Sequence, residues 1–212
     1  HTDAVQAACW IDLRTIWPLV DTMALSAHKF GGPKGVGILV VREGKYFEPI
    51  VLGGGQERDR RSGTHNVGGI VAAAEALRMT DVERISEVAR ISALRDKLFA
   101  GLLAIEGAHR TIPAENSVPG VVHVCLQGIE SESLLYLLDE ADVCASAASA
   151  CASGAMEPSH VLAAMGLTSD LTMGALRLSL GHTTTDADVD RAIEAITDAV
   201  GRIRAVQNRR SL

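Results

Sequence analysis

Lys29 is one of only four lysines in this chain, and its surroundings suit a lysine that bonds covalently to a carbonyl carbon. It lies in the run Ser-Ala-His-Lys-Phe-Gly-Gly-Pro-Lys-Gly, residues 26–35, between two apolar stretches. A lysine that forms a Schiff base must be held still and partly desolvated, so that its amine can lose its proton. Ser26 and His28 precede Lys29 directly and can donate hydrogen bonds to a phosphate. The segment therefore predicts a Schiff-base lysine beside phosphate-binding groups.

Two polar residues near the start of the chain extend this pattern. A lysine before a glycine-rich turn is more often a solvated surface charge, and an aspartate taken alone is more often a capping residue, so each needs support. Asp3 and Gln6 supply an acid and an amide. Pyridoxal 5'-phosphate (PLP) needs an anion facing its pyridinium nitrogen and a hydrogen-bond partner for its phenolate oxygen. Together these residues predict a PLP site, whereas residues 31–35 lack the Gly-Lys-Ser/Thr order of a nucleotide-binding loop.

Cys151 is the predicted nucleophile. It lies in the run Ala-Ser-Ala-Ala-Ser-Ala-Cys-Ala-Ser-Gly, residues 145–154, where almost no bulky side chain is available to anchor the backbone. A thiol on such a loop can move between two positions. Cys125 and Cys144 occur in apolar, strand-like contexts and are predicted to be small buried hydrophobes. Cys9 has no supporting neighbours, and we assign it no role.

These stretches, together with Arg-Asp-Arg-Arg-Ser-Gly-Thr at 58–64 and Ala-Leu-Arg-Leu-Ser-Leu-Gly at 175–181, resemble the cysteine desulfurases, PLP enzymes of the class V aminotransferase family. The resemblance runs in order over essentially the whole chain. Members of that family carry a long N-terminal region before the Asp-x-x-Gln segment, which opens this chain, so the chain resembles the C-terminal portion only. The implied fold is α/β, a PLP-dependent transferase of fold type I. A truncated large domain (1–82) would precede a linking helix and a small α+β C-terminal domain (83–212).

The resemblance also implies a role for each residue. Lys29 forms the Schiff base, Asp3 keeps the pyridine nitrogen protonated, and Gln6 bonds to the ring oxygen. Ser26 and His28 bind the cofactor phosphate.

Two further roles come from the same resemblance. Thr64 reaches the cofactor phosphate of the neighbouring subunit, which implies a homodimer. Arg177 grips the α-carboxylate of the substrate with the bidentate geometry of a guanidinium. A structural salt bridge is the alternative role for Arg177, because a charge within an apolar strand must be paired.

The implied reaction converts L-cysteine to L-alanine and leaves a persulfide on Cys151. Sulfur then passes to an iron-sulfur scaffold protein or another sulfur acceptor, for cluster assembly or tRNA thiolation, and the small-residue loop indicates the long-loop subgroup of the family. Alternatives are a selenocysteine lyase or another class V PLP enzyme, which sulfur release from cysteine would discriminate. A non-catalytic dimerisation or scaffold-binding fragment is a further alternative, and the isolated chain is expected to be inactive.

Composition narrows the class of protein. The chain has 212 residues, of which 47% are hydrophobic and 22% charged, a balance that can bury a core. A net charge of -6 gives no overall basic field, so no direct nucleic acid binding is expected. No apolar run is long enough to cross a bilayer and no signal peptide is recognisable, so we expect a cytoplasmic protein without membrane contact.

The four cysteines form no CxxC pair and the histidines show no metal-ligand spacing, which predicts reduced thiols and no metal site.

Hydrophobic periodicity predicts the elements that position these residues. Lys29 is expected on a loop between strands. The predicted elements are a strand over 36–41, a buried helix over 67–79, an amphipathic helix from Ile85 to Leu102 that joins two lobes, a strand over 118–126, a helix over 131–141 with Ser131 as N-cap, a short helix over 159–166, a strand over 175–180, and a last helix capped by Thr185.

Overall fold

The computed structural model describes residues 1–147 and 159–210, and the chain divides into two compact units, residues 1–88 and 89–212. One helix, α3 (Val67–Leu103), contributes residues to both units. The two helices predicted over this range are continuous, because the intervening residues 80–84 include no glycine or proline that would interrupt them. The domain bounds 1–82 and 83–212 stay a prediction.

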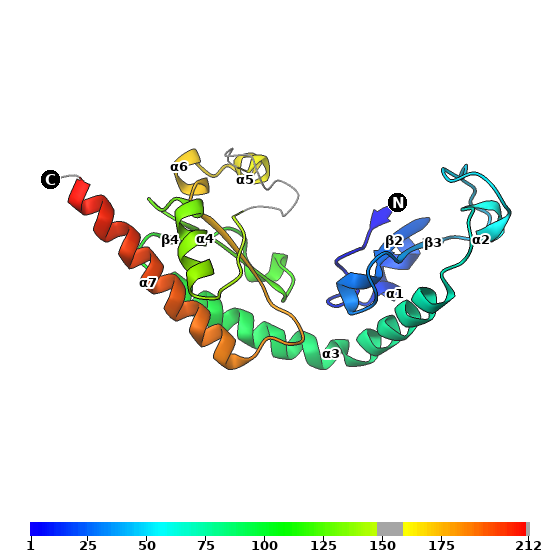
Figure 1. Cartoon of the computed structure of the whole chain (residues 1–212), viewed down its shortest axis with the longest axis horizontal. Helices are drawn as coiled ribbons and strands as arrows, with labels where there is room; N and C mark the ends of the chain where they lie inside the picture. Colours follow the sequence, from blue (N-terminus) through cyan, green and yellow to red (C-terminus); the bar gives the residue numbers. More distant parts are fainter. Residues whose placement is uncertain (148–158, 211–212) are drawn as a thin grey trace. The chain divides into compact units, whose positions relative to one another are not determined.

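A three-stranded mixed sheet organises the first unit (Figure 1). Its order is β1 (Thr2–Asp3), β2 (Thr22–Ser26) and β3 (Gly37–Val41). β1 runs parallel to β2, with Asp3 opposite Ala24, whereas β3 runs antiparallel to β2. The strand predicted over 36–41 is therefore confirmed as β3.

The connection between β2 and β3 is more regular than a loop. It begins with the 3-10 helix η2 (Ala27–Phe30), which contains Lys29. Gly31 ends η2 with a φ of 82°, in the left-handed region where glycine carries no Cβ penalty. The glycine-rich run after Lys29 thus ends a short helical turn and lets the chain reverse into β3.

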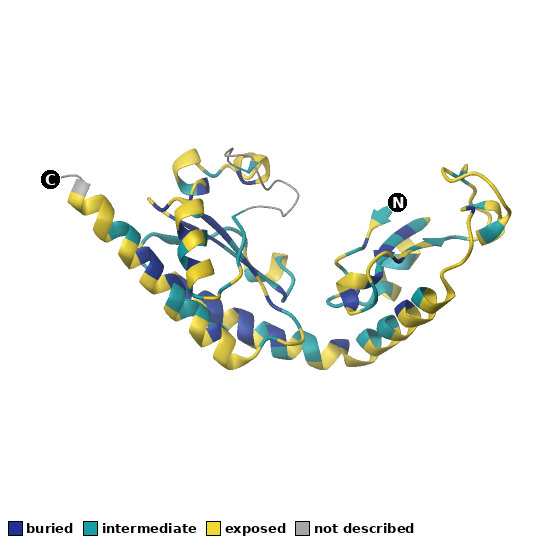
Figure 2. Cartoon of the chain, viewed as in Figure 1, coloured by how far each residue is buried: buried dark blue, intermediate teal, exposed yellow. Residues whose placement is uncertain are grey.

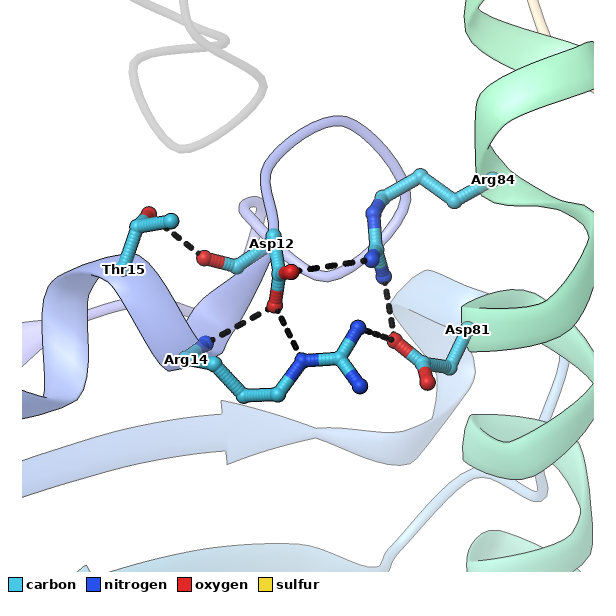
Figure 3. A network of polar contacts seen from close by, with 5 residues as sticks. All are labelled: Asp12, Arg14, Thr15, Asp81 and Arg84. Atoms are coloured by element: carbon cyan, nitrogen blue, oxygen red, sulfur yellow. Dashed lines mark hydrogen bonds and ion pairs between the residues drawn. The ribbon is translucent and has the colours of Figure 1, made fainter.

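Ionic contacts attach the first part of α3 to α1 (Leu13–Ile16) within the first unit (Figure 3). The Asp12 carboxylate caps α1 by accepting from the backbone N–H of Arg14 at 3.0 Å, and it also accepts from Arg14 Nε at 2.7 Å. Arg84 on α3 is buried and lies 2.7 Å from Asp81 Oδ1 and 3.7 Å from Asp12 Oδ2. The two carboxylates compensate the buried guanidinium. The hydrogen bonds from Arg14 hold the pKa of Asp12 below its usual value.

The core of the first unit is small, and one prediction about it is wrong. Its buried residues are Ala4, Ala8, Met23, Leu25, Ala27, Phe30, Val36 and Ala73. Residues 67–79 were predicted to be a buried helix, but Val67 is 65% exposed, Val71 is 62% exposed, and only Ala73 is buried (Figure 2). A helix that is apolar on all sides needs neighbours on all sides. The described residues of the first unit pack against only one side of α3 over residues 67–79.

The second unit contains an antiparallel sheet of order β4 (Ala108–Arg110), β5 (Val121–Leu126) and β6 (Ala175–Ser179). These strands confirm the ones predicted over 118–126 and 175–180. Its helices are the second part of α3, η3 (Ala114–Asn116), α4 (Ser131–Glu140), α5 (His160–Ala164), α6 (Ser169–Thr172) and α7 (Asp186–Arg210). The core is aliphatic and includes Ile91, Leu102, Val124, Leu134, Leu176 and Ile196, all at most 1% exposed.

Two helix N-caps were predicted from the sequence, of which the cap of α7 is confirmed and the cap of α4 is wrong. Thr185 caps α7, because its Oγ1 accepts from the backbone N–H of Asp188 at 3.2 Å while Asp188 Oδ2 accepts from the backbone N–H of Thr185 at 2.8 Å. Ser131 was predicted to cap α4, but it is the first residue of that helix. Its hydroxyl donates instead to the carbonyls of Met173 and Ala175, at 2.6 and 2.8 Å. Ser131 therefore connects α4 to the segment that leads into β6.

Candidate active site

The parallel pairing of β1 with β2 places most of the predicted cofactor residues at one edge of the sheet. Asp3 is the last residue of β1, and Ser26 is the last residue of β2. Parallel strands end at the same edge, which is where ligands bind in α/β sheets. Gln6 follows β1, and His28 and Lys29 follow β2 on η2. The local sequence therefore gathers five of the predicted residues from two segments.

The polar groups at this edge differ in how far they are already paired. Ser26 Oγ and His28 Nδ1 share a hydrogen bond of 2.9 Å. Asp3 Oδ1 accepts from the backbone N–H of Val5 at 3.0 Å. Within the part of the chain that the structure describes, the side chains of Gln6 and Lys29 make no hydrogen bond, and both residues are exposed. An amine and an amide remain free to meet a ligand.

Two residues that sequence reasoning did not assign fix the backbone of η2. Cys9 Sγ donates to the carbonyl of Lys29 at 3.3 Å, and Thr80 Oγ1 donates to the carbonyl of Phe30 at 3.2 Å. These carbonyls belong to the last turn of a short helix and would otherwise lack an intrahelical partner. The contacts join segments 20 and 50 residues apart. No local sequence signal could have indicated them.

Thr64 lies on the segment between α2 (Gln56–Asp59) and α3, and it is exposed. Among the described residues none bonds to its hydroxyl. The element labelled α2 is a left-handed turn rather than an α-helix, because Glu57, Arg58 and Asp59 have φ values of 50°, 56° and 62°. Figure 2 shows this segment as largely exposed. The Thr64 hydroxyl is thus available, on a loop with an unusual backbone.

Arg177 lies on β6 in the second unit, opposite His123 on β5. Its backbone N–H and carbonyl both bond to Ser146, at 2.7 and 3.1 Å, so His123 and Arg177 form the closer, non-hydrogen-bonded type of cross-strand pair. The Arg177 Nε is buried and bonds to no described residue, and no carboxylate in the described ranges pairs with its guanidinium. Among the described residues, the structural salt bridge considered as the alternative role of Arg177 is therefore not found. The Arg177 Nε–H is instead a donor that bonds to none of them.

The protonation of His123 is affected by this position. Burial lowers the pKa of His123, and the positive charge of Arg177 lowers it further. Its Nδ1 shares a hydrogen bond of 3.0 Å with Thr111 Oγ1. The ring is therefore held neutral beside a guanidinium.

Of the two cysteines predicted to be buried, one is buried and the other is exposed. Cys151, the predicted nucleophile, lies outside the described residues. Cys125 is fully buried, as predicted, and burial raises the pKa of its thiol to about 11. Cys144 was predicted to be buried but is exposed; the described part of its segment pairs with β6 at the isolated Ser146–Arg177 bridge. It lines a cavity of about 260 Å³ that includes none of the predicted site residues.

Comparison with known proteins decides the family. The model of the family described as aminotransferase class-V matches residues 1–192. The chain belongs to this family. It is 42% identical over 96% of its length to a cysteine desulfurase of Gluconacetobacter diazotrophicus, and 42% identical over 96% to cysteine desulfurase IscS of Methanosarcina thermophila. These matches cover 51% and 50% of the two relatives, so the chain spans about half the length of the curated relatives it matches.

A solved structure supports the same assignment. A NifS-like protein is 38% identical and superposes with a TM-score of 0.83 over 95% of this chain and 52% of that one. This chain thus has the expected α/β fold of the type I transferases. In residues 1–147 and 159–210 there is no cluster of three metal-binding side chains and no helix long and apolar enough to cross a membrane.

Proposed function

We propose that this chain contributes the site of a cysteine desulfurase, which converts L-cysteine to L-alanine and leaves the sulfur as a persulfide on Cys151. The observation that carries the proposal is the shared edge of β1 and β2, because the segments that carry an acid, an amide, a hydroxyl, an imidazole and the Lys29 amine lie at or follow the ends of these two strands. The similarity to proteins named cysteine desulfurase supports it over 96% of the chain.

The donor set at this edge fits PLP. Lys29 would hold the aldehyde carbon, Ser26 and His28 the phosphate, Gln6 the phenolate oxygen and Asp3 the pyridinium nitrogen. The amine of Lys29 and the amide of Gln6, which bond to none of the described residues, are the groups that such a ligand would need free. When bound, the cofactor supplies an electron sink for a substrate carbon that loses a proton. The Lys29 amine would be the base that takes up this proton from Cα.

Arg177 would hold the α-carboxylate of cysteine. Its buried and unbonded Nε costs free energy unless a partner is supplied. A carboxylate accepts two parallel hydrogen bonds from a guanidinium, and lysine cannot copy this geometry. Holding the carboxylate would leave the substrate sulfur open to attack by the Cys151 thiolate. The sulfur–sulfur bond would form as the carbon–sulfur bond breaks, and the electron pair of that bond would stay on the substrate carbon, which takes up a proton to become the methyl group of alanine.

The proposal extends to partners. Thr64 would bind the cofactor phosphate of a second copy, which makes the working form a homodimer. The sulfur acceptor would be an iron-sulfur scaffold protein or another acceptor, which would take the sulfur from Cys151. A cytoplasmic location fits such acceptors.

Replacing Cys151 tests the sulfur step. In the complete native polypeptide that contains these residues, Cys151→Ser should retain bound PLP and its spectral response to cysteine, because neither needs the thiol. It should accumulate no persulfide and transfer no sulfur. Cys125→Ser, which changes a fully buried thiol, should chiefly lower stability. Normal sulfur transfer by Cys151→Ser, with loss in Cys125→Ser or Cys144→Ser, would show that the nucleophile is misassigned.

A further inference from the structure

Hydrogen bonds within the loop of residues 51–65 connect its first half to the two residues that precede Thr64. Ser62 is 8% exposed, and its hydroxyl donates to the carbonyl of Gly54 at 2.6 Å while its backbone N–H donates to the carbonyl of Val51 at 3.2 Å. Gln56 Oε1 accepts from the backbone N–H of Gly63 at 3.0 Å. Both residues preceding Thr64 are therefore held by groups from the first half of the loop.

The backbone of the loop is shaped to allow this closure. Three consecutive residues without glycine, Glu57 to Asp59, adopt the left-handed region, which is unfavourable for residues that carry a Cβ. A Cβ on Gly54 would lie 2.8 Å from Gln56 Oε1, so a larger residue there would require the Gln56 side chain to shift from this position. Strain of this kind persists only where surrounding contacts impose it, and it clusters at functional sites.

The Thr64 side chain follows the two residues that these hydrogen bonds hold. The Thr64 hydroxyl bonds to no described residue, whereas His65 on its other side lies 3.5 Å from Glu57 Oε1. The loop thus fixes the backbone that precedes Thr64, and among the described residues nothing bonds to the Thr64 hydroxyl, which can therefore donate to a ligand.

From this geometry we propose that Gln56 and Ser62 are positioning residues, which hold the Thr64 hydroxyl ready to bind the phosphate of PLP. The inference rests on the proposed function, since it needs Thr64 to contact that phosphate. The side-chain carbonyl of Gln56 acts through Gly63 and does not itself touch the ligand. A donor that is already ordered loses less entropy when it binds, so removing the brace should weaken binding of the phosphate group specifically.

A double-mutant cycle on the native polypeptide, stripped of cofactor and titrated with PLP, tests the inference. Gln56→Met keeps the length of the side chain and removes the acceptor. We expect Thr64→Ala to raise the dissociation constant for PLP about tenfold, the usual effect of losing a hydrogen bond to a charged group. Gln56→Met should raise it about threefold, and the double variant should match Thr64→Ala alone.

Two further measurements separate positioning from general damage. Pyridoxal, which lacks the phosphate, should bind equally to wild type and Gln56→Met. Amide hydrogen exchange should accelerate in the peptide containing Gly63 and Thr64. Gln127→Ala, a change at an exposed glutamine of the second unit, should change neither the dissociation constant nor this exchange.

The outcomes separate the two levels of the proposal. If Thr64→Ala weakens PLP binding but Gln56→Met has no effect, adds fully to Thr64→Ala, or weakens pyridoxal equally, the positioning role is overturned and the Thr64 contact stands. If Thr64→Ala leaves PLP binding unchanged, the phosphate contact proposed for Thr64 is wrong and the positioning role falls with it.

Discussion

His123 and Arg177 show how a single cross-strand pair sets a local charge. His123 lies on β5 directly opposite Arg177, and the residue is half-buried. Burial and the neighbouring guanidinium both disfavour imidazolium, so the pKa of His123 lies below its usual value of 6.5. A neutral ring leaves Arg177 as the cation of the pair that a carboxylate would meet.

This lowered pKa makes stability depend on pH. At pH 7.5 the ring is neutral in both the folded and the unfolded chain. As the pH falls through 6.5, the unfolded chain binds a proton that the folded chain does not, so the free energy of unfolding decreases until the lower folded pKa is reached. The slope is at most about 1.4 kcal/mol per pH unit, and solvent screening reduces it.

Urea unfolding between pH 7.5 and 5 would measure this slope. His123→Asn should remove the part due to this ring, whatever its effect on stability at pH 7.5. His109→Asn, at an exposed histidine on β4, should keep the slope of the wild type. An unchanged slope in His123→Asn would contradict the assignment.

Residues differed in how well the sequence predicted them. Lys29 could be singled out because the polar residues around it are adjacent in sequence, and local order is what a motif records. Cys144 could not be placed, because its exposure depends on where its segment leaves the edge of β6. Gln56 carried no signal either, since the role proposed for it depends on a hydrogen bond from Gly63, seven positions away.

Among the elements, α7 is the one whose start is most fully specified by local residues. Thr185 and Asp188 bond reciprocally, and Val189, Ile196 and Val200 are buried on one face of the helix. Such a capping box satisfies two backbone N–H groups that the first turn leaves without partners.

Removing the Thr185 hydroxyl should therefore destabilise the second unit. Thr185→Ala should lower the free energy of unfolding by about 1 kcal/mol, the usual cost of losing an N-cap side chain. Thr185→Ser, which keeps the hydroxyl, should lose less. The matched control is Thr183→Ala, at an exposed residue with no side-chain hydrogen bond to the described residues, which should be close to neutral. Urea unfolding would measure all three, and equal losses in Thr185→Ala and Thr183→Ala would contradict the capping role.

α3 and α4 mark the limit of prediction at this scale. The sequence located α4 and the two parts of α3, which it predicted as separate helices, because helical periodicity depends on neighbours three and four residues apart. It could not tell that Val67 and Val71 would be exposed, since that depends on which other segments pack against α3. Nor could it show that Ser131 bonds to the carbonyls of Met173 and Ala175, more than 40 residues away, instead of capping α4.

At the scale of the whole molecule, the chain combines two units with separate sheets and separate parts of the proposed chemistry. The first carries Lys29 and the groups proposed to hold PLP, and the second carries Arg177 and the segment leading to Cys151. The order of motifs along the sequence predicted the family, which the match over residues 1–192 confirms. The residue roles are proposals that rest on one chemical claim, that Lys29 is the site of covalent attachment.

Borohydride trapping tests that claim most directly. Borohydride reduces the bond between a lysine amine and PLP to a stable secondary amine, which survives digestion and can be located by peptide mapping. In the native polypeptide the account predicts a pyridoxyl group on Lys29, and no labelling of this chain after Lys29→Ala. A pyridoxyl group on Lys34, Lys45 or Lys97, with Lys29 unmodified, would contradict it.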